Sequence, residues 1–115
     1  MEDDKGIVQD KERRRYPRLP IKIKFSCHDS TPVKGDGLLQ FFSRDLSVGG
    51  VFLSGESAFS PGNVLHLDFN LPDSQETITV SGVIVRKDTQ GVGIRFLTLN
   101  IDEFEKVECF VNEML

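Results

Sequence analysis

The feature that most constrains the fold of this chain is a strict alternation of apolar and polar residues. Between residues 19 and 27 every second side chain is apolar: Leu19, Ile21, Ile23, Phe25 and Cys27. Successive side chains of a β-strand point to opposite faces, so this pattern predicts a half-buried strand over 19–27. The alternation returns in 65–71, 78–86 and 92–96, which are predicted as three further strands. Gly82, in the middle of its segment, predicts a bulge or a close approach of two chain segments.

Segments rich in turn-forming residues separate these strands. Glycine, proline, serine and aspartate mark a loop over 28–37, after which 38–46 is predicted as a strand. The tight turn 47–50 contains two glycines and leads into a short strand, 51–53, which indicates a hairpin. The connector 54–62 carries the turn sequence Ser-Pro-Gly. Six short strands with regular turns predict a small antiparallel barrel of the all-β class.

The period of the apolar residues changes in the last segment, 100–115. Asn100 can cap a helix, and Glu103 three residues later completes a capping-box pattern. Beyond this cap the apolar residues recur at spacings of three and four: Phe104, Val107, Val111 and Met114. The pattern predicts an amphipathic C-terminal helix over 100–115, whose apolar face packs on the strands and covers an opening of the barrel.

The length of the chain suits one folded domain. Its 115 residues are enough for a single core, and 38% apolar residues, among them 9 Phe, are enough to fill that core. Residues 1–12 are polar and show no period, so we expect them to form a flexible N-terminal arm. The folded domain is expected to span residues 13–115.

Two cysteines, Cys27 and Cys109, form no CxxC pair and have no metal-binding spacing. Because both lie within apolar patterns, they are expected to be reduced thiols in or near the core of a cytoplasmic protein. The chain begins with an acidic segment and has no apolar run of the roughly 20 residues that a membrane helix needs. Neither a secretory signal nor membrane insertion is therefore expected.

Basic residues are concentrated near the start of the expected domain. Residues 11–24 contain seven basic residues and one acidic residue, a local charge of +6, whereas the whole chain carries −4 and the remainder therefore −10. Such a basic spot on an acidic chain indicates a small anionic ligand or a local anionic surface. It argues against the binding of duplex DNA or RNA, which usually requires a basic face.

Within this spot, Arg13, Arg14 and Arg18 surround the sequence Tyr16-Pro17. Proline prevents a helix from running through the stretch and favours an extended conformation in the residue before it. The arginines therefore lie where the arm becomes the first strand, and at least Arg18 should be held by the fold. A solvated arm without a ligand is the alternative interpretation of the same cluster.

Two motifs, in this order, resemble those of a known family. The first is RxxxR, here Arg14 to Arg18, and the second is [D/N]xSxxG, here Asp45 to Gly50. Together with a weaker similarity in 91–96, they make the chain from about residue 12 onward similar to a PilZ domain, the bacterial receptor module for cyclic di-GMP. The resemblance implies a six-stranded PilZ-like β-barrel.

Arginine side chains suit both parts of such a ligand. The planar fork of a guanidinium can bind O6 and N7 of guanine with two hydrogen bonds, and it also pairs with phosphate. Arg14 and Arg18 are predicted for these roles. Arg13 precedes the motif, and in this family an arginine at that position looks compatible with a stacked ligand pair. The resemblance therefore implies two molecules of cyclic di-GMP per chain.

The residues of the second motif offer complementary groups. The carboxylate of Asp45 can accept hydrogen bonds from N1–H and the N2 amine of guanine, and the hydroxyl of Ser47 can donate to a phosphate. Gly49 and Gly50 are expected to leave backbone N–H groups open to an anion. The alternative is that Asp45 and Ser47 bond their own backbone at the end of a hairpin, and that the two glycines serve only the turn.

Three functions compete at this stage. A regulatory module that binds cyclic di-GMP is favoured, and a non-binding adaptor of the same fold is the alternative. A small enzyme is disfavoured because the sequence shows no nucleophile–base pair, no paired carboxylates and no metal-binding set, so no catalytic residue, metal or cofactor is expected. His28, His66 and Arg95 are expected to be surface residues. The chain has no second domain, so it is expected to act on an unidentified effector protein in motility, polysaccharide synthesis or surface behaviour.

Overall fold

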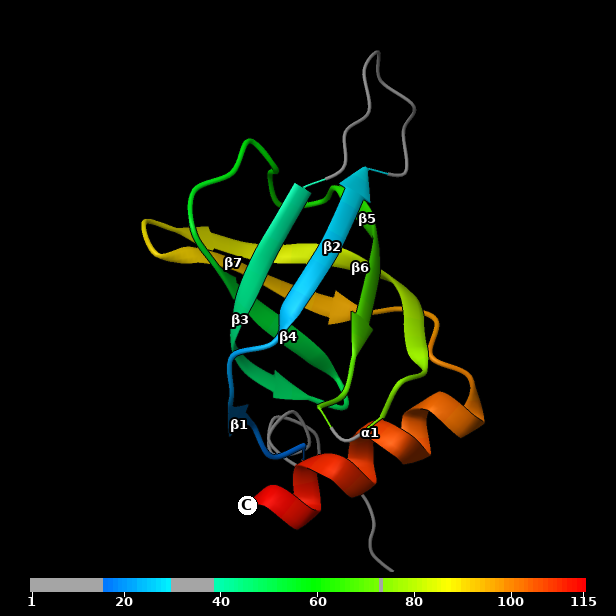
Figure 1. The fold of residues 1–115 in the computed structure, drawn as a ribbon. Coiled ribbons are helices and arrows are strands. Elements are labelled where there is room, and N and C mark those ends of the chain that lie inside the picture. Colours follow the sequence, from blue (N-terminus) through cyan, green and yellow to red (C-terminus); the bar gives the residue numbers. More distant parts are fainter. Residues whose placement is uncertain (1–15, 30–38, 73) are drawn as a thin grey trace, which may run out of the picture.

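The strands of this chain close into a barrel, with a helix across one end (Figure 1). The computed structural model describes residues 16–29, 39–72 and 74–115. The elements are β1 (Leu19–Pro20), β2 (Lys24–Asp29), β3 (Leu39–Ser47), β4 (Gly50–Ser54), β5 (Val64–Asn70), β6 (Thr77–Asp88), β7 (Gly91–Phe96) and α1 (Ile101–Met114). The strand order is β1-β3-β2-β5-β6-β7-β4, and a β3–β4 pairing closes the ring. The predicted six-stranded antiparallel barrel with a C-terminal helix is confirmed, and β1 is one additional short strand.

The prediction of one continuous strand over 19–27 is wrong, because the structure divides this segment. Leu19 of β1 lies opposite Leu46 of β3, whereas Lys24, the first residue of β2, lies opposite Phe42 of the same strand. Between these pairs four residues, 20–23, therefore oppose three, 43–45, which is the one-residue excess of a β-bulge. The bulge follows β1 directly and separates it from β2.

The side chain of Ser43 fills the break in the ladder. Its hydroxyl oxygen accepts the backbone N–H of Ile23 at 2.9 Å and donates to the backbone carbonyl of Ile21. Ser43 is only 4% exposed, so without these partners a buried hydroxyl and two backbone groups would be unsatisfied. The bulge is therefore a stabilised part of the fold.

The other predicted strands match the structure to within two residues at each end. The expected close approach at Gly82 is present, since a Cβ built there would lie 2.5 Å from Cγ2 of Ile94. The register shift of this strand lies further along, between Ile84 and Arg86.

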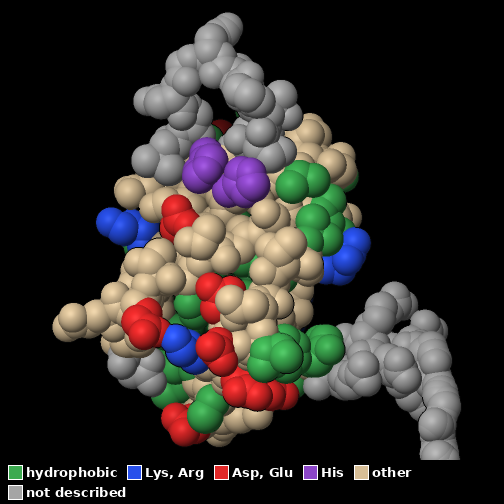
Figure 2. Space-filling model, turned by 90° about the vertical axis from the view of Figure 1, so that its right-hand side faces the viewer, with side chains coloured by type: hydrophobic (Ala, Val, Ile, Leu, Met, Phe, Trp, Pro, Cys, Tyr) green, Lys and Arg blue, Asp and Glu red, His purple; other side chains and the backbone are tan. Residues whose placement is uncertain are grey.

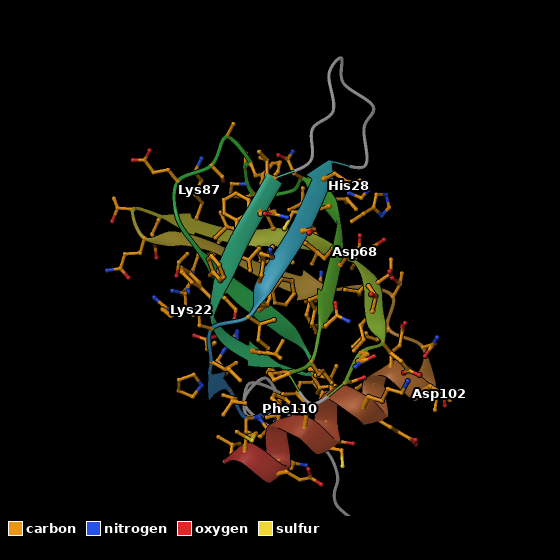
Figure 3. The ribbon with its side chains drawn as sticks, in the orientation of Figure 1. Lys22, His28, Asp68, Lys87, Asp102 and Phe110 are labelled. Atoms are coloured by element: carbon orange, nitrogen blue, oxygen red, sulfur yellow. The ribbon has the colours of Figure 1, made fainter. Side chains whose placement is uncertain are left out.

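The core lies inside the barrel and beneath α1. Its most buried members are Phe25, Cys27, Leu46, Val51, Leu53, Leu65 and Leu67. The helix adds Val107, Phe110 and Val111, and Figure 3 shows Phe110 where α1 meets the barrel. The predicted capping box is present, because the Glu103 N–H donates to Oδ1 of Asn100 at 2.8 Å and the reciprocal bond also forms. Met114, predicted on the buried face, is 55% exposed at the last turn, and Phe110 supplies the buried side chain instead.

The two thiols have different surroundings. Cys27 is fully buried, and burial, followed by the charge of Asp68, raises the pKa of its thiol to about 12. Cys109, expected in or near the core, lies on the exposed side of α1, where its Sγ is 3.5 Å from Oε2 of Glu113. Within the described residues, no helix has the length and apolar character needed to cross a membrane.

Candidate ligand site

An open groove runs along the barrel beside α1, and we call it the arginine groove. It has a volume of about 680 Å³ and is lined by residues from the segment before β1, the β3–β4 turn, β6, β7 and α1. Four predicted site residues line it: Arg18, Ser47, Gly49 and Gly50. Arg13 and Arg14, like the arm predicted for residues 1–12, lie outside the described residues.

Arg18 and Asp45 bind each other at one end of this groove. Nη1 of Arg18 donates to Oδ1 of Asp45 at 2.9 Å, and Nε of Arg44 lies 3.4 Å from the other carboxylate oxygen. The pairing of β1 with β3 explains the contact, because Pro20 lies directly opposite Asp45 and Arg18 comes two residues earlier. Arg18 is therefore held by the fold, as expected, while its side chain remains 54% exposed.

The turn between β3 and β4 is held by its own serine. The N–H of Gly49 donates to Oγ of Ser47 at 3.1 Å, and Ser47 is only 3% exposed. The hydroxyl lies 3.5 Å from the carbonyl oxygen of Gly50, to which it can donate. The expectation that the Gly49 N–H is open to an anion does not hold in this structure. The alternative interpretation of Ser47 as a residue that bonds its own turn describes these contacts.

The two glycines of the turn meet different neighbours. A Cβ on Gly50 would lie 2.1 Å from the backbone carbonyl oxygen of Ile94, so the close pairing of β4 with β7 requires glycine there. A Cβ on Gly49 would lie 3.1 Å from Cδ2 of the Tyr16 ring. Neither glycine has the positive φ that is found at Gly55 and Gly62. The turn therefore depends on close approach rather than on left-handed backbone.

Two further arginines, Arg86 and Arg95, also line the groove. Arg95 is exposed, as predicted, and lies opposite Gly50 in the β4–β7 ladder, while Arg86 follows the register shift in β6. No Asp or Glu is among the described residues that line the groove. The sequence did not identify these arginines as site residues, because only the pairing of distant strands brings them to the motif.

A stacked arrangement of side chains positions two of the arginines around Phe52. This ring is 1% exposed although it does not belong to the barrel core, because it faces outward opposite Gly93. The guanidinium carbons of Arg44 and Arg86 lie 3.8 and 5.1 Å from its centroid. Cation–π contacts of this kind favour a fixed guanidinium over a freely moving one. Phe52 thus links the arginine that contacts Asp45 to one that lines the groove.

Tyr16 connects the segment before β1 to both the turn and the helix. Its ring packs edge-on against Phe104, with 6.4 Å between centroids, and it also borders Gly49. These contacts place the start of the described chain at the wall of the arginine groove. The RxxxR motif therefore ends beside the second motif.

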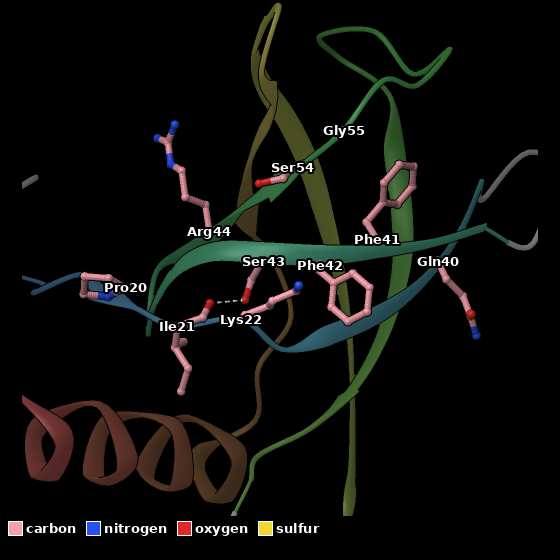
Figure 4. A pocket seen from close by; sticks show the side chains of 10 residues that line it. All are labelled: Pro20, Ile21, Lys22, Gln40, Phe41, Phe42, Ser43, Arg44, Ser54 and Gly55. Atoms are coloured by element: carbon pink, nitrogen blue, oxygen red, sulfur yellow. Dashed lines mark hydrogen bonds between the residues drawn. The ribbon is translucent and has the colours of Figure 1, made fainter.

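A second open groove lies on the barrel wall near β3, and we call it the phenylalanine groove. It has a volume of about 810 Å³, and Figure 4 shows Phe41, Phe42, Lys22 and Arg44 around it. Nζ of Lys22 lies 4.8 Å above the centroid of Phe42, which is 45% exposed. None of the predicted ligand residues lines this groove.

The chemistry of the arginine groove favours an anion with a flat hydrogen-bonding part. It offers the guanidinium groups of Arg18, Arg86 and Arg95, the ring of Tyr16 as a wall, and a carboxylate at its edge. Among the residues that the structure describes, no group of three or more His, Cys, Asp or Glu side chains could hold a metal ion.

Comparison with known proteins identifies the family and supports the fold. A sequence model of the PilZ domain matches residues 12–113. The fold is similar to Bacillus subtilis MotI/DgrA, an inhibitor of motility (TM-score 0.74, 16% identity), over 92% of this chain and 51% of MotI, so the chain spans about half the length of that protein. It is also similar to the PilZ domain of CeSA from a cellulose-synthesizing bacterium (TM-score 0.63, 18% identity, 84% of this chain and 96% of that one). The PilZ domain of Escherichia coli YcgR aligns with a TM-score of 0.66 and 18% identity over 89% of this chain and 91% of that one. No curated protein sequence matches the chain.

Proposed function

Because this chain belongs to the PilZ domain family, we propose that it is a receptor for cyclic di-GMP that uses the arginine groove. The observation that carries the proposal is that Arg18 and the residues of the second motif from Ser47 to Gly50 line one groove, whose described lining residues include no carboxylate. The PilZ domain of E. coli YcgR was solved with cyclic di-GMP, which supports the choice of ligand.

In this proposal the arginines bind the anionic and guanine parts of the ligand. Arg14 and Arg18 each supply a planar fork to a phosphate or to O6 and N7 of guanine. Arg86 and Arg95, which also line the groove, add positive charge, which favours the entry of an anion. Because the whole chain carries a charge of −4, these arginines form a local positive region on an otherwise acidic protein.

Asp45 supplies the acceptor for guanine. A carboxylate has about four lone-pair positions, so the two guanidiniums that it already contacts leave room for N1–H and N2 of a base. Ser47 and Gly49 then shape the turn against which the ligand lies, and Gly50 permits β4 and β7 to approach. Ser47 can contact a phosphate only by exchanging its weak bond to the Gly50 carbonyl.

The residues before β1 determine the stoichiometry. We expect Arg13 to contact a second, stacked molecule of cyclic di-GMP, and the arm to become ordered against the Asp45–Gly50 turn when the ligand neutralises its charges. Titration should then give two ligands for the wild type and fewer for Arg13→Ala. Hydrogen exchange of residues 9–18 should slow at saturating ligand, and equal exchange with and without ligand would contradict the ordering.

We expect another protein to recognise the ligand-bound form of this domain. Ordering of the arm changes the surface around the groove, and a partner that recognises the ordered surface would transmit the signal in motility, polysaccharide synthesis or surface behaviour. MotI, which shares this fold, is named as an inhibitor of motility. Pull-down from the native cell, with and without cyclic di-GMP, would identify the effector.

Isothermal titration tests the proposal directly. Cyclic di-GMP should bind, while GMP, which has one phosphate and one guanine, should bind much more weakly. Analysis of the recovered ligand by mass spectrometry should show intact cyclic di-GMP, whereas a linear product would indicate catalysis. No heat of binding by a folded protein would reject the receptor and favour the non-binding adaptor.

A further inference from the structure

The two histidines of the chain meet on the barrel surface, away from both grooves. His28 of β2 lies directly opposite His66 of β5, with ring centroids 5.3 Å apart and an angle of 42° between the ring planes. Both side chains are half-buried. Figure 2 shows them side by side on one face, and the sequence contains no other histidine. Because 38 positions separate the two histidines in the sequence, their spacing gives no indication that they form a pair.

The distance between the rings matches that of two imidazoles that share a metal ion. Imidazole nitrogen binds zinc at about 2.1 Å, which for a tetrahedral ion places the two ring centroids about 5 Å apart. Directly opposed residues of an antiparallel pair have their Cβ atoms about 5 Å apart and their side chains on the same face. The backbone therefore holds the two ligands at a suitable separation before an ion arrives.

A hydrogen bond also orients one of the rings. Nδ1 of His66 lies 3.2 Å from Oγ of Ser81, and the backbone N–H of Ser81 donates to Oγ1 of Thr98 at 3.0 Å. When Nδ1–H donates to the hydroxyl, Nε2 carries the lone pair that a metal requires. Metal-binding histidines usually have such a second partner, which fixes the ring and the tautomer.

We propose that His28 and His66 form a two-imidazole site for a divalent transition metal ion, with Cu²⁺, Ni²⁺ and Zn²⁺ as the fitting class. Imidazole is a preferred ligand of these ions, whereas Mg²⁺ and Ca²⁺ require oxygen ligands. The described residues contain no group of three metal ligands, so the two imidazoles are the ligands that this part of the chain supplies, and water can fill the remaining positions. The site is thus open and exchangeable, and it is separate from the proposed receptor groove.

The test uses protein without a histidine tag, in a Cys109→Ser background that removes the exposed thiol. Titration with NiCl2 and ZnCl2, which do not oxidise thiols, should give one ion per chain. His28→Asn and His66→Asn should each weaken binding by at least about tenfold, because each leaves a single imidazole. Ser81→Ala should weaken it by up to about tenfold, through loss of ring orientation.

Thermal unfolding provides the second measurement. Bound metal should raise the melting temperature of the parent protein and leave that of the His28→Asn/His66→Asn variant unchanged. The melting temperatures without metal establish that the variants are folded. Equal metal affinity in the parent and the double variant, or no binding up to about 1 mM metal, would overturn the proposal.

Discussion

The arginine groove and the phenylalanine groove differ in chemistry far more than in size. The phenylalanine groove is the larger, at about 810 Å³ against about 680 Å³, and each is lined by basic residues. Two polar side chains of the phenylalanine groove already have partners: Ser43 bonds to two backbone groups, and Lys22 lies over an aromatic ring. Three guanidinium groups line the arginine groove, those of Arg18, Arg86 and Arg95, whereas two cations, Lys22 and Arg44, line the phenylalanine groove. The number and type of cations, rather than the volume, therefore distinguish a candidate site for a small anion.

Each groove is also lined by a glycine, and the two glycines are required for different reasons. Gly50 in the arginine groove is needed because a backbone carbonyl lies where its Cβ would be, whereas Gly55 in the phenylalanine groove has a φ of +119°. A side chain against backbone cannot be accommodated by a rotamer change, but an unfavourable φ has a limited cost. The arginine groove is thus built on the less tolerant part of the barrel.

The largest effect should come from these two glycines. We expect Gly50→Ala to destabilise the fold by about 3 kcal/mol or more, because β4 must move away from β7. Gly55→Ala should cost about 1–2 kcal/mol, because only the local backbone is strained. Urea unfolding of both variants gives the comparison. Equal losses of stability would mean that the backbone tolerates a Cβ at Gly50 and at Gly55 equally well.

Arg18→Ala and Lys22→Ala form the next test. Each variant removes one exposed cation, but only Arg18 lines the proposed site. Arg18→Ala should weaken cyclic di-GMP binding by about 2 kcal/mol, roughly 30-fold, since charge-assisted hydrogen bonds are lost. Lys22→Ala should bind as the wild type does, by isothermal titration. A similar loss in both variants would show that binding depends on overall charge rather than on this groove.

Asp45→Ala should have a smaller effect on affinity and a specific effect on base selection. Removing the carboxylate also frees Arg18, which offsets part of the lost hydrogen bonding, so we expect a loss of about tenfold for cyclic di-GMP. The wild type should prefer cyclic di-GMP over cyclic di-AMP, which has no N2 amine, and the variant should lose much of this preference. A wild type that binds both ligands equally would remove this role from Asp45.

The smallest effect is expected for Phe42→Ala in the phenylalanine groove. The ring is 45% exposed, so truncation should cost less than about 1 kcal/mol of stability. Cyclic di-GMP affinity should be unchanged. A clear loss of binding in this folded variant would connect the two grooves and weaken the distinction between them.

The sequence predicted the elements better than their connections. Alternation and capping are local, so most of the strands and the Asn100 cap can be predicted from the sequence. The bulge after β1 could not, because it depends on Ser43, a residue about twenty positions away that supplies the missing hydrogen bonds. The exposure of Cys109 was also missed, because an apolar pattern on a helix says little about a residue at its margin.

The candidate site shows the same limit. The motifs containing Arg18 and Asp45 were visible in the sequence, but the ion pair between them arises from the pairing of β1 with β3. Arg86 and Arg95 carry no sequence signal of their own, since they reach the groove through the register of β6 and β7. Local patterns therefore identify the residues of a site more readily than the arrangement of charge around it.

The closed order of the strands has a consequence for how other proteins can recognise this domain. Many signalling proteins bind a partner by adding a strand to an exposed sheet edge. Here β2 to β7 each have neighbours on both sides among the described strands, and only the two-residue β1 ends the order. Such a ring also offers little template for edge-to-edge aggregation. A partner that binds the described part of the chain would therefore contact side chains on the barrel wall or the helix, where a single substitution can change the choice of partner without altering the fold.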